Sequence, residues 1–117
     1  MRPAKFMIDR NRWYRGRRMG SRLHRATDDK ACCMGLIAEQ CGVPRAELTD
    51  RCTLDAVAAA APHRFDIPEE LLAAPLQSRI IADIYLVNDD YALNDSEREE
   101  RLIKLFAAVG VTVTFIN

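Results

Sequence analysis

Apolar and polar side chains alternate near both ends of the chain. Lys5–Asp9 places Phe6 and Ile8 on one face, and Thr112–Ile116 alternates in the same way. A period of two is typical of a β-strand that is buried on one face. We therefore expect both segments to be strands and to pair with each other in an antiparallel sheet.

The clearest helical pattern lies just before the C-terminal strand. Apolar residues recur there at the i, i+3, i+4, i+7 spacing of a buried helical face, at Leu102, Leu105, Phe106 and Val109. Ser96 and Glu99 have the spacing of a capping box, in which each side chain bonds the backbone N–H of the other residue. The sequence therefore predicts a helix that starts at Ser96 and stops at Gly110.

Shorter segments between these elements predict further helices and one more strand. A helix is expected over Ala31–Cys41, and Thr27, Asp28 and Asp29 precede it as candidate caps. The other segments are a strand over Ser21–Ala26 and helices over Leu54–Ala60, Pro68–Ala74 and Leu76–Val87. The last segment also fits a buried strand because it is rich in β-branched residues, and we favour the helix.

Together these elements predict one α+β domain over residues 1–117. The two chain ends form its small antiparallel sheet, and about three to five helices cover one face of that sheet. No apolar run reaches the ~20 residues that a membrane-spanning helix needs. The N-terminus also lacks the apolar stretch of a signal peptide, so we expect a cytoplasmic protein of a bacterial host.

The net charge of zero hides a strong asymmetry along the chain. Residues 1–25 hold nine Lys or Arg and one acid, a net charge of +8, so the remainder carries −8. Such a split indicates a basic loop that meets an anion, or an acidic surface that meets a basic partner. Alternatively, the two regions lie side by side and neutralise each other within one fold.

The basic region contains arginines interleaved with an aromatic residue. Guanidinium groups bind phosphates, and aromatic rings stack on bases, so this composition suits a nucleotide or nucleic-acid site. The candidates are Arg10, Arg12, Trp13, Arg15, Arg17, Arg18 and Arg22. In the structural alternative, Trp13 fills part of the core and the arginines surround it.

The acidic region offers candidates for contact with a partner protein. They are Asn88, Asp89, Asp90, Glu97 and Glu100. The run Asn88–Asp90 could hold a hard cation, but the calcium-loop pattern D-x-[DN]-x-[DN]-G is missing. We therefore expect no metal here, and a role in shaping a turn is the alternative.

The four cysteines predict neither a metal site nor a disulfide. Cys32, Cys33, Cys41 and Cys52 include no C-x-x-C pair, and we expect them to be reduced and buried. Cys32 could instead be reactive, since a helix N-terminus favours the thiolate. Gly35 is expected to let another element approach closely. No catalytic constellation can be assembled, so we expect neither an enzyme nor a cofactor.

Several short motifs follow one another in an order that resembles a known group of proteins. They are I-D-R-x-x-W at Ile8–Trp13, C-C-x-G at Cys32–Gly35, N-D-D at Asn88–Asp90, R-x-x-x-L-x-x-L-F from Arg98 and G-V-x-V-x-F from Gly110. The order is similar to that of small uncharacterised accessory proteins of bacteriophages and prophages. The resemblance implies an accessory protein of a mobile element that binds a host factor, as inhibitors of CRISPR and other defence systems do.

The expected function is therefore that of a non-enzymatic interaction protein. The resemblance implies an inhibitor of a host-defence (anti-CRISPR-like) or nucleic-acid-handling complex, with a host or defence protein as partner. A binder of nucleotides or nucleic acid through the Arg-rich loop 10–22 is the alternative. The sequence leaves the oligomeric state open.

Overall fold

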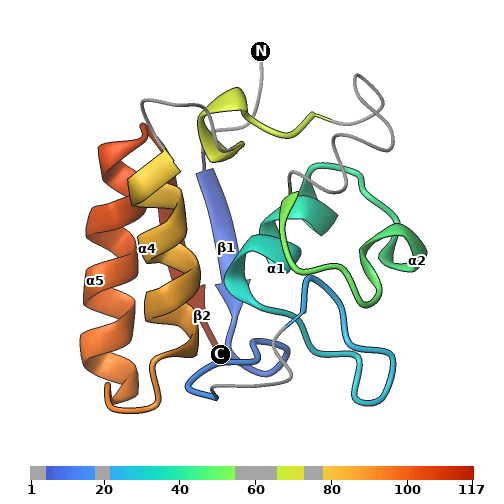
Figure 1. The fold of residues 1–117 in the computed structure, drawn as a ribbon, viewed down its shortest axis with the longest axis horizontal. Coiled ribbons are helices and arrows are strands. Elements are labelled where there is room, and N and C mark those ends of the chain that lie inside the picture. Colours follow the sequence, from blue (N-terminus) through green and yellow to red (C-terminus); the bar gives the residue numbers. More distant parts are fainter. Residues whose placement is uncertain (1–4, 18–21, 55–65, 73–77) are drawn as a thin grey trace.

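Two parallel strands, one near each end of the chain, form a small sheet (Figure 1). In the computed structural model, which describes residues 5–17, 22–54, 66–72 and 78–117, β1 (Lys5–Asp9) pairs with β2 (Thr112–Ile116). Phe6 lies opposite Val113. The predicted strands and their pairing are found, but the predicted antiparallel direction is wrong. All the helices lie between the two strands, and such a crossover connection permits a parallel pair, whose direction no local pattern encodes.

Helices cover one face of this sheet. Phe6, Ile8 and Val113 are buried, whereas Met7 and Thr114 on the opposite face are exposed. α1 (Cys33–Gln40) packs against β1, and α5 (Asp95–Ala108) packs against β2. α4 (Ser78–Asp89) packs against α5, so the two form a helical hairpin beside the sheet (Figure 1).

The hairpin resolves one ambiguity of the sequence and corrects one prediction. The segment that fitted either a helix or a buried strand is α4, whose Ile81 and Ile84 are buried. The capping box of α5 is formed by Asn94 and Glu97, two residues before the predicted pair. The Asn94 side chain accepts a hydrogen bond from the Glu97 N–H at 2.8 Å. Asn caps a helix as well as Ser does, and the pairs Asn94–Glu97 and Ser96–Glu99 have the same three-residue spacing. The sequence alone therefore could not show which pair forms the capping box.

The start of α1 also differs from the prediction. The helix begins at Cys33, two residues after the predicted start at Ala31, and its N-cap is Cys32 and not one of the acids at positions 28 and 29. The Cys33 N–H donates instead to the side chain of Asn88 at 3.1 Å, a partner from α4. Asp29 has a positive φ of 58° and lies in a turn. A residue distant in sequence therefore replaces the local cap.

Several short elements between α1 and α4 also depart from the sequence pattern. Residues 22–26 form no strand, although Leu23 is buried and His24 makes an isolated bridge to Thr49. α2 (Arg45–Leu48) was not predicted, and only the short 3-10 helix η1 (Glu69–Leu71) stands where a helix from Pro68 was expected. Apart from Leu54, the predicted helix over 54–60 lies outside the described residues.

The core confirms two predictions about small side chains. Cys32, Cys33 and Cys41 are buried, although Cys52 is exposed. A Cβ on Gly35 would lie 1.8 Å from the carbonyl oxygen of Leu23. The absence of a side chain at position 35 therefore allows the 22–26 segment to lie directly on α1.

Candidate functional site

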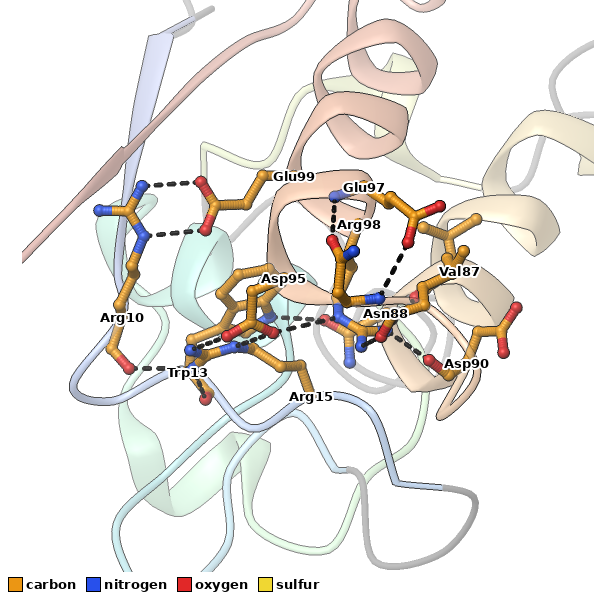
Figure 2. Close-up of polar contacts among 12 residues, drawn as sticks. Arg10, Trp13, Arg15, Val87, Asn88, Asp90, Asp95, Glu97, Arg98 and Glu99 are labelled. Carbon is orange, nitrogen blue, oxygen red and sulfur yellow. Dashed lines mark hydrogen bonds and ion pairs between the residues drawn. The ribbon is translucent and has the colours of Figure 1, made fainter.

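Two arginines of the N-terminal segment bind carboxylates at the start of α5 (Figure 2). Arg10 donates from Nε and Nη2 to both oxygens of Glu99, at 2.8 and 2.7 Å. Arg15 donates in the same two-pronged way to Asp95, at 3.2 and 2.9 Å. The hydrogen bonds from Arg15 lower the pKa of Asp95 below its ordinary value. Both cations are therefore neutralised within the fold.

Arg12 belongs to a second cluster of charges on the surface. It donates to Glu39 at 3.0 Å, and Arg45 donates to the same carboxylate at 2.7 Å. Asp29 lies between the two arginines and also accepts a bond from His24, whose Nε2 is 2.7 Å from its Oδ1. The bond to His24 and the charges of Arg12 and Arg45 lower the pKa of Asp29.

The remaining basic candidates differ in their surroundings. Arg17 is exposed, Arg22 is half-buried, and Arg18 lies outside the described residues. Neutralisation within the fold, the alternative left open by the charge split, thus applies to Arg10, Arg12 and Arg15.

Trp13 occupies the interior. Its side chain is 1% exposed, and its indole N–H donates to Asn88 at 2.7 Å. The ring contacts that of Phe115, with centroids 4.8 Å apart, and the Arg15 guanidinium lies 4.6 Å from the centre of the indole. The indole face is therefore already engaged inside the protein, as in the structural alternative for this residue.

Asn88 links three segments of the chain. Its side-chain oxygen accepts hydrogen bonds from Trp13 and from the Cys33 N–H, and its nitrogen donates to the Tyr14 carbonyl and to Asp89. These four bonds use the full capacity of an amide side chain. Asn88 is only 1% exposed, so of the acidic-region candidates it alone is placed in the core and not at the surface.

Arg98 is a structural residue that the sequence analysis missed. It is 2% exposed and donates to the carbonyls of Val87 and Asp90, at 3.0 and 2.6 Å, and of Leu93 at 2.7 Å. These oxygens lie just where α4 ends, and the negative end of a helix dipole favours a cation. Position 98 lies one helical turn before Leu102, in phase with the apolar stripe of α5, and that phase could have indicated its burial.

Charged residues lie where α4 ends and α5 begins; Asp89 and Asp90 are half-buried there, and Glu97 is exposed. We call Asp89, Asp90, Tyr91 and Glu97 the acidic tip. In the described part of the chain none of its three carboxylates forms a salt bridge, and Tyr91 is 59% exposed. Glu100 lies one turn further along α5 and pairs with Lys104 at 3.2 Å. Figure 2 shows Asp90 and Glu97 beside Arg98, whose contacts with the connection fix its shape.

The cysteines provide no activated thiol at the start of α1. Burial raises the pKa of Cys32 to about 12 and raises that of Cys33 well above its ordinary value. The backbone hydrogen bonds at the helix N-terminus oppose this shift but are outweighed by burial. The structure therefore gives no support to the hypothesis of a reactive Cys32.

Comparison with known proteins identifies no relative. No family model matches the chain, and neither the curated proteins nor the solved structures contain a match. Within the described ranges, no group of three or more His, Cys, Asp or Glu side chains could hold a metal ion. The same ranges contain no helix that is long and apolar enough to cross a membrane.

Proposed function

We propose that the protein acts by binding, and that the acidic tip binds a basic surface on a partner protein. One observation carries this proposal: the arginine-rich segment neutralises Asp95 and Glu99 but leaves the carboxylates of the tip without an ion pair. The charges of these three carboxylates are thus not balanced by an ion pair. Each accepts one hydrogen bond from an uncharged donor, which leaves oxygen lone pairs for a cation. Such a group attracts a cationic surface over long distances and accelerates encounter with it.

The composition and rigidity of the tip also suit a protein interface. Tyr91 combines a large apolar ring with a hydroxyl group, and tyrosine is enriched among the residues that contribute most to binding. Leu86, about one helical turn before Asp90, is 67% exposed and adds apolar area. The buried Arg98 holds the connection in place, so little ordering is needed on binding.

The class of partner follows from charge and from the resemblance to phage accessory proteins. A basic protein surface that evolved to bind nucleic acid is complementary to a cluster of carboxylates. The resemblance adds a host context, in which the partner is a component of a defence or nucleic-acid-handling complex. Occupation of its basic surface would exclude nucleic acid and inhibit the complex.

The alternative function, nucleotide or nucleic-acid binding by the Arg-rich loop, receives less support. Arg10, Arg12 and Arg15 are bound to carboxylates, so a phosphate would have to displace an existing partner from each of them. The ring of Trp13 is buried and cannot stack on a base without leaving the core. We therefore base the proposal on the acidic tip.

Capture from a bacterial lysate tests the proposal. The immobilised protein is incubated with nuclease-treated lysate at low salt, and the bound proteins are quantified by mass spectrometry. We expect basic, nucleic-acid-binding proteins to be retained and to be released by added DNA. The double variant Asp89→Lys/Asp90→Lys should retain at least about tenfold less of them, since it reverses the charge of the tip.

A matched control separates the tip from overall charge. Asp66→Lys/Glu70→Lys changes the net charge by the same amount at two exposed positions outside the hairpin. This variant should capture the same proteins as the unmodified chain. Equal losses in both double variants would mean that capture depends on net charge alone and would refute a specific role of the tip.

A further inference from the structure

His24 lies between the end of α2 and the turn that precedes α1. The residue is 8% exposed, and its carbonyl accepts a hydrogen bond from the Asp50 N–H at 3.1 Å. Its two ring nitrogens face two different parts of the chain. Nδ1 lies 2.9 Å from Oγ1 of Thr49, the residue that ends α2, and Nε2 lies 2.7 Å from Oδ1 of Asp29 in the turn. The ring therefore bonds α2 and the turn at once.

Both neighbours of the ring are acceptors of hydrogen bonds. The Thr49 hydroxyl donates its one hydrogen to the Arg45 carbonyl at 2.9 Å, so its oxygen can only accept from His24. Asp29 accepts two bonds from Arg45, at 3.0 and 2.8 Å. The bond to His24 and the charges of Arg12 and Arg45 lower the pKa of Asp29, so its carboxylate is ionised at neutral pH and donates nothing. Each ring nitrogen must therefore carry a hydrogen, which makes the described ring an imidazolium.

A buried imidazolium needs an anion beside it, and Asp29 provides one. Arg12 and Arg45 also contact this carboxylate, at 3.7 and 2.8 Å. The other charged side chains of the surrounding segments are Arg25, Asp28, Glu39 and Asp50. Arg25 pairs with Asp28 at 3.2 Å, Glu39 pairs with the two arginines that contact Asp29, and Asp50 is exposed. Asp29 is thus the acid that bonds the ring.

Loss of one ring proton would change the bonding in a defined direction. Nε2 keeps its hydrogen because it faces the ionised Asp29, so the proton leaves Nδ1. Nδ1 then becomes an acceptor, and the Thr49 hydroxyl can turn its hydrogen from the Arg45 carbonyl to the ring. The Arg45 carbonyl retains the bond from the Thr49 backbone N–H at 3.0 Å. Each of these groups therefore keeps a partner in both states.

We propose that His24 and Thr49 form a pH-sensitive switch at the end of α2. With the ring charged, Nδ1 donates to Thr49 and the Thr49 hydroxyl donates to the Arg45 carbonyl. With the ring neutral, the hydroxyl donates to Nδ1 and releases the carbonyl. A histidine ring changes its charge between about pH 5 and 8, so the switch operates near neutral pH. It does not involve the acidic tip and is independent of the proposed function.

Nitrogen NMR of the histidine ring over about pH 5–8.5 tests the proposal. The chain has two histidines, so the variant His63→Gln leaves His24 as the one ring observed. We expect both ring nitrogens to carry a hydrogen at the acid end of the range and only Nε2 to carry one at the alkaline end. The amide signal of Thr49, whose N–H shares the Arg45 carbonyl with the hydroxyl, should shift with the same midpoint.

Two pairs of variants separate the switch from a general effect of pH. Asp29→Asn keeps an acceptor oxygen but removes the charge, so the midpoint should fall by about one pH unit, a roughly tenfold weaker binding of the proton. Asp28→Asn is the matched control: it removes the adjacent charge, which pairs with Arg25, and should move the midpoint far less. Thr49→Val removes the hydroxyl at similar shape and should remove most of the amide shift at position 49, whereas Thr49→Ser should retain it.

Several results would overturn the proposal. One is a ring that stays neutral down to about pH 5, and another is a neutral ring that carries its hydrogen on Nδ1. Equal displacement of the midpoint by Asp29→Asn and Asp28→Asn would show that Asp29 does not hold the proton. Equal amide shifts in Thr49→Val and Thr49→Ser would show that the hydroxyl does not turn.

Discussion

At the scale of single residues, the polar interactions of the interior are concentrated in Asn88 and Arg98. Asn88 bonds the loop that follows β1, the first turn of α1 and α4 at once, and Arg98 binds the carbonyls at the end of α4. Each satisfies buried groups that the helices and strands leave without a partner. Their contribution to stability is therefore set by what would remain unpaired without them.

Replacement of Asn88 by alanine tests its role. Asn88→Ala leaves the Trp13 indole N–H and the Cys33 N–H without an acceptor in the core. An unpaired buried donor costs about 1–3 kcal/mol, so the free energy of unfolding should fall by about 3 kcal/mol in urea denaturation. Asp89→Ala removes a half-exposed acceptor next to it and should cost less than about 1 kcal/mol. Equal losses would contradict the role assigned to Asn88.

Gly16 offers a second test at this scale. Its φ is +70°, and a Cβ there would lie 2.9 Å from Nη2 of Arg98. Gly16→Ala should therefore lower the free energy of unfolding by about 2 kcal/mol, through both backbone strain and displacement of the guanidinium. Gly110→Ala has a similar φ of +77° with no neighbour within 4 Å and should cost about 1 kcal/mol. If thermal denaturation shows no difference between the two, the contact with Arg98 is unimportant.

At the scale of the elements, the sequence predicted where the main helices and strands lie better than it predicted strand direction or the exact start of a helix. The periodicity of β1, β2, α4 and α5 identified where each lies, because burial on one face imposes a pattern on the residues themselves. The direction of β2 depends on where the long crossover ends, and the start of α1 depends on Asn88. Neither is encoded in the neighbouring residues. The single-turn α2 was missed because four residues are too few to show a period.

For the candidate site, too, the sequence identified some residues but could not predict the contacts between distant ones. The acidic positions were identified from composition, and most of them are at the surface. The pairing of Arg10 with Glu99 and of Arg15 with Asp95 joins residues about ninety and eighty positions apart. The sequence offered neutralisation within the fold as one hypothesis beside an anion-binding loop, but it could not distinguish between the two. The burial of Trp13 was likewise only one of two hypotheses.

The link between the N-terminal segment and α5 predicts a dependence on pH. The folded-state pKa of Asp95 lies below its ordinary value of 3.8, so the folded protein binds this proton less tightly than the unfolded chain. The ion pair with Arg15 therefore stabilises the fold above about pH 4 and is lost as the pH falls through the lowered pKa. Because Asp95 is half-exposed, its contribution at pH 7 should be about 0.5 kcal/mol.

Asp95→Asn measures this contribution. The variant should be less stable than the unmodified protein at pH 7, and the difference should be smaller at about pH 2.5, because the carboxyl group takes up a proton as the pH falls through its lowered pKa. Urea denaturation at the two pH values gives both numbers. Asp66→Asn, at an exposed position outside the hairpin, serves as the control. A difference that persists unchanged at low pH would show that the ion pair is not its cause.

At the scale of the whole molecule, the charge split along the sequence is distributed by the fold over two regions. Part of the basic N-terminal segment neutralises the acids that face it and so holds the sheet to the α4–α5 hairpin. Asp89, Asp90 and Glu97, which it does not reach, belong to the acidic tip, where α4 ends and α5 begins. The proposed binding of a basic partner thus follows from how the fold distributes its charges and not from their total, which is zero.

The most direct test compares the two charged regions in one capture experiment. Asp89→Lys/Asp90→Lys alters the acidic tip, and Arg17→Ala/Arg18→Ala removes two arginines of the Arg-rich loop, of which Arg17 is exposed and Arg18 lies outside the described residues. Both are immobilised beside the unmodified chain in nuclease-treated lysate at low salt. We expect the arginine variant to retain the same basic proteins and the tip variant to lose at least about nine-tenths of them. Retention by the tip variant together with loss by the arginine variant would contradict the proposed function and assign binding to the Arg-rich loop.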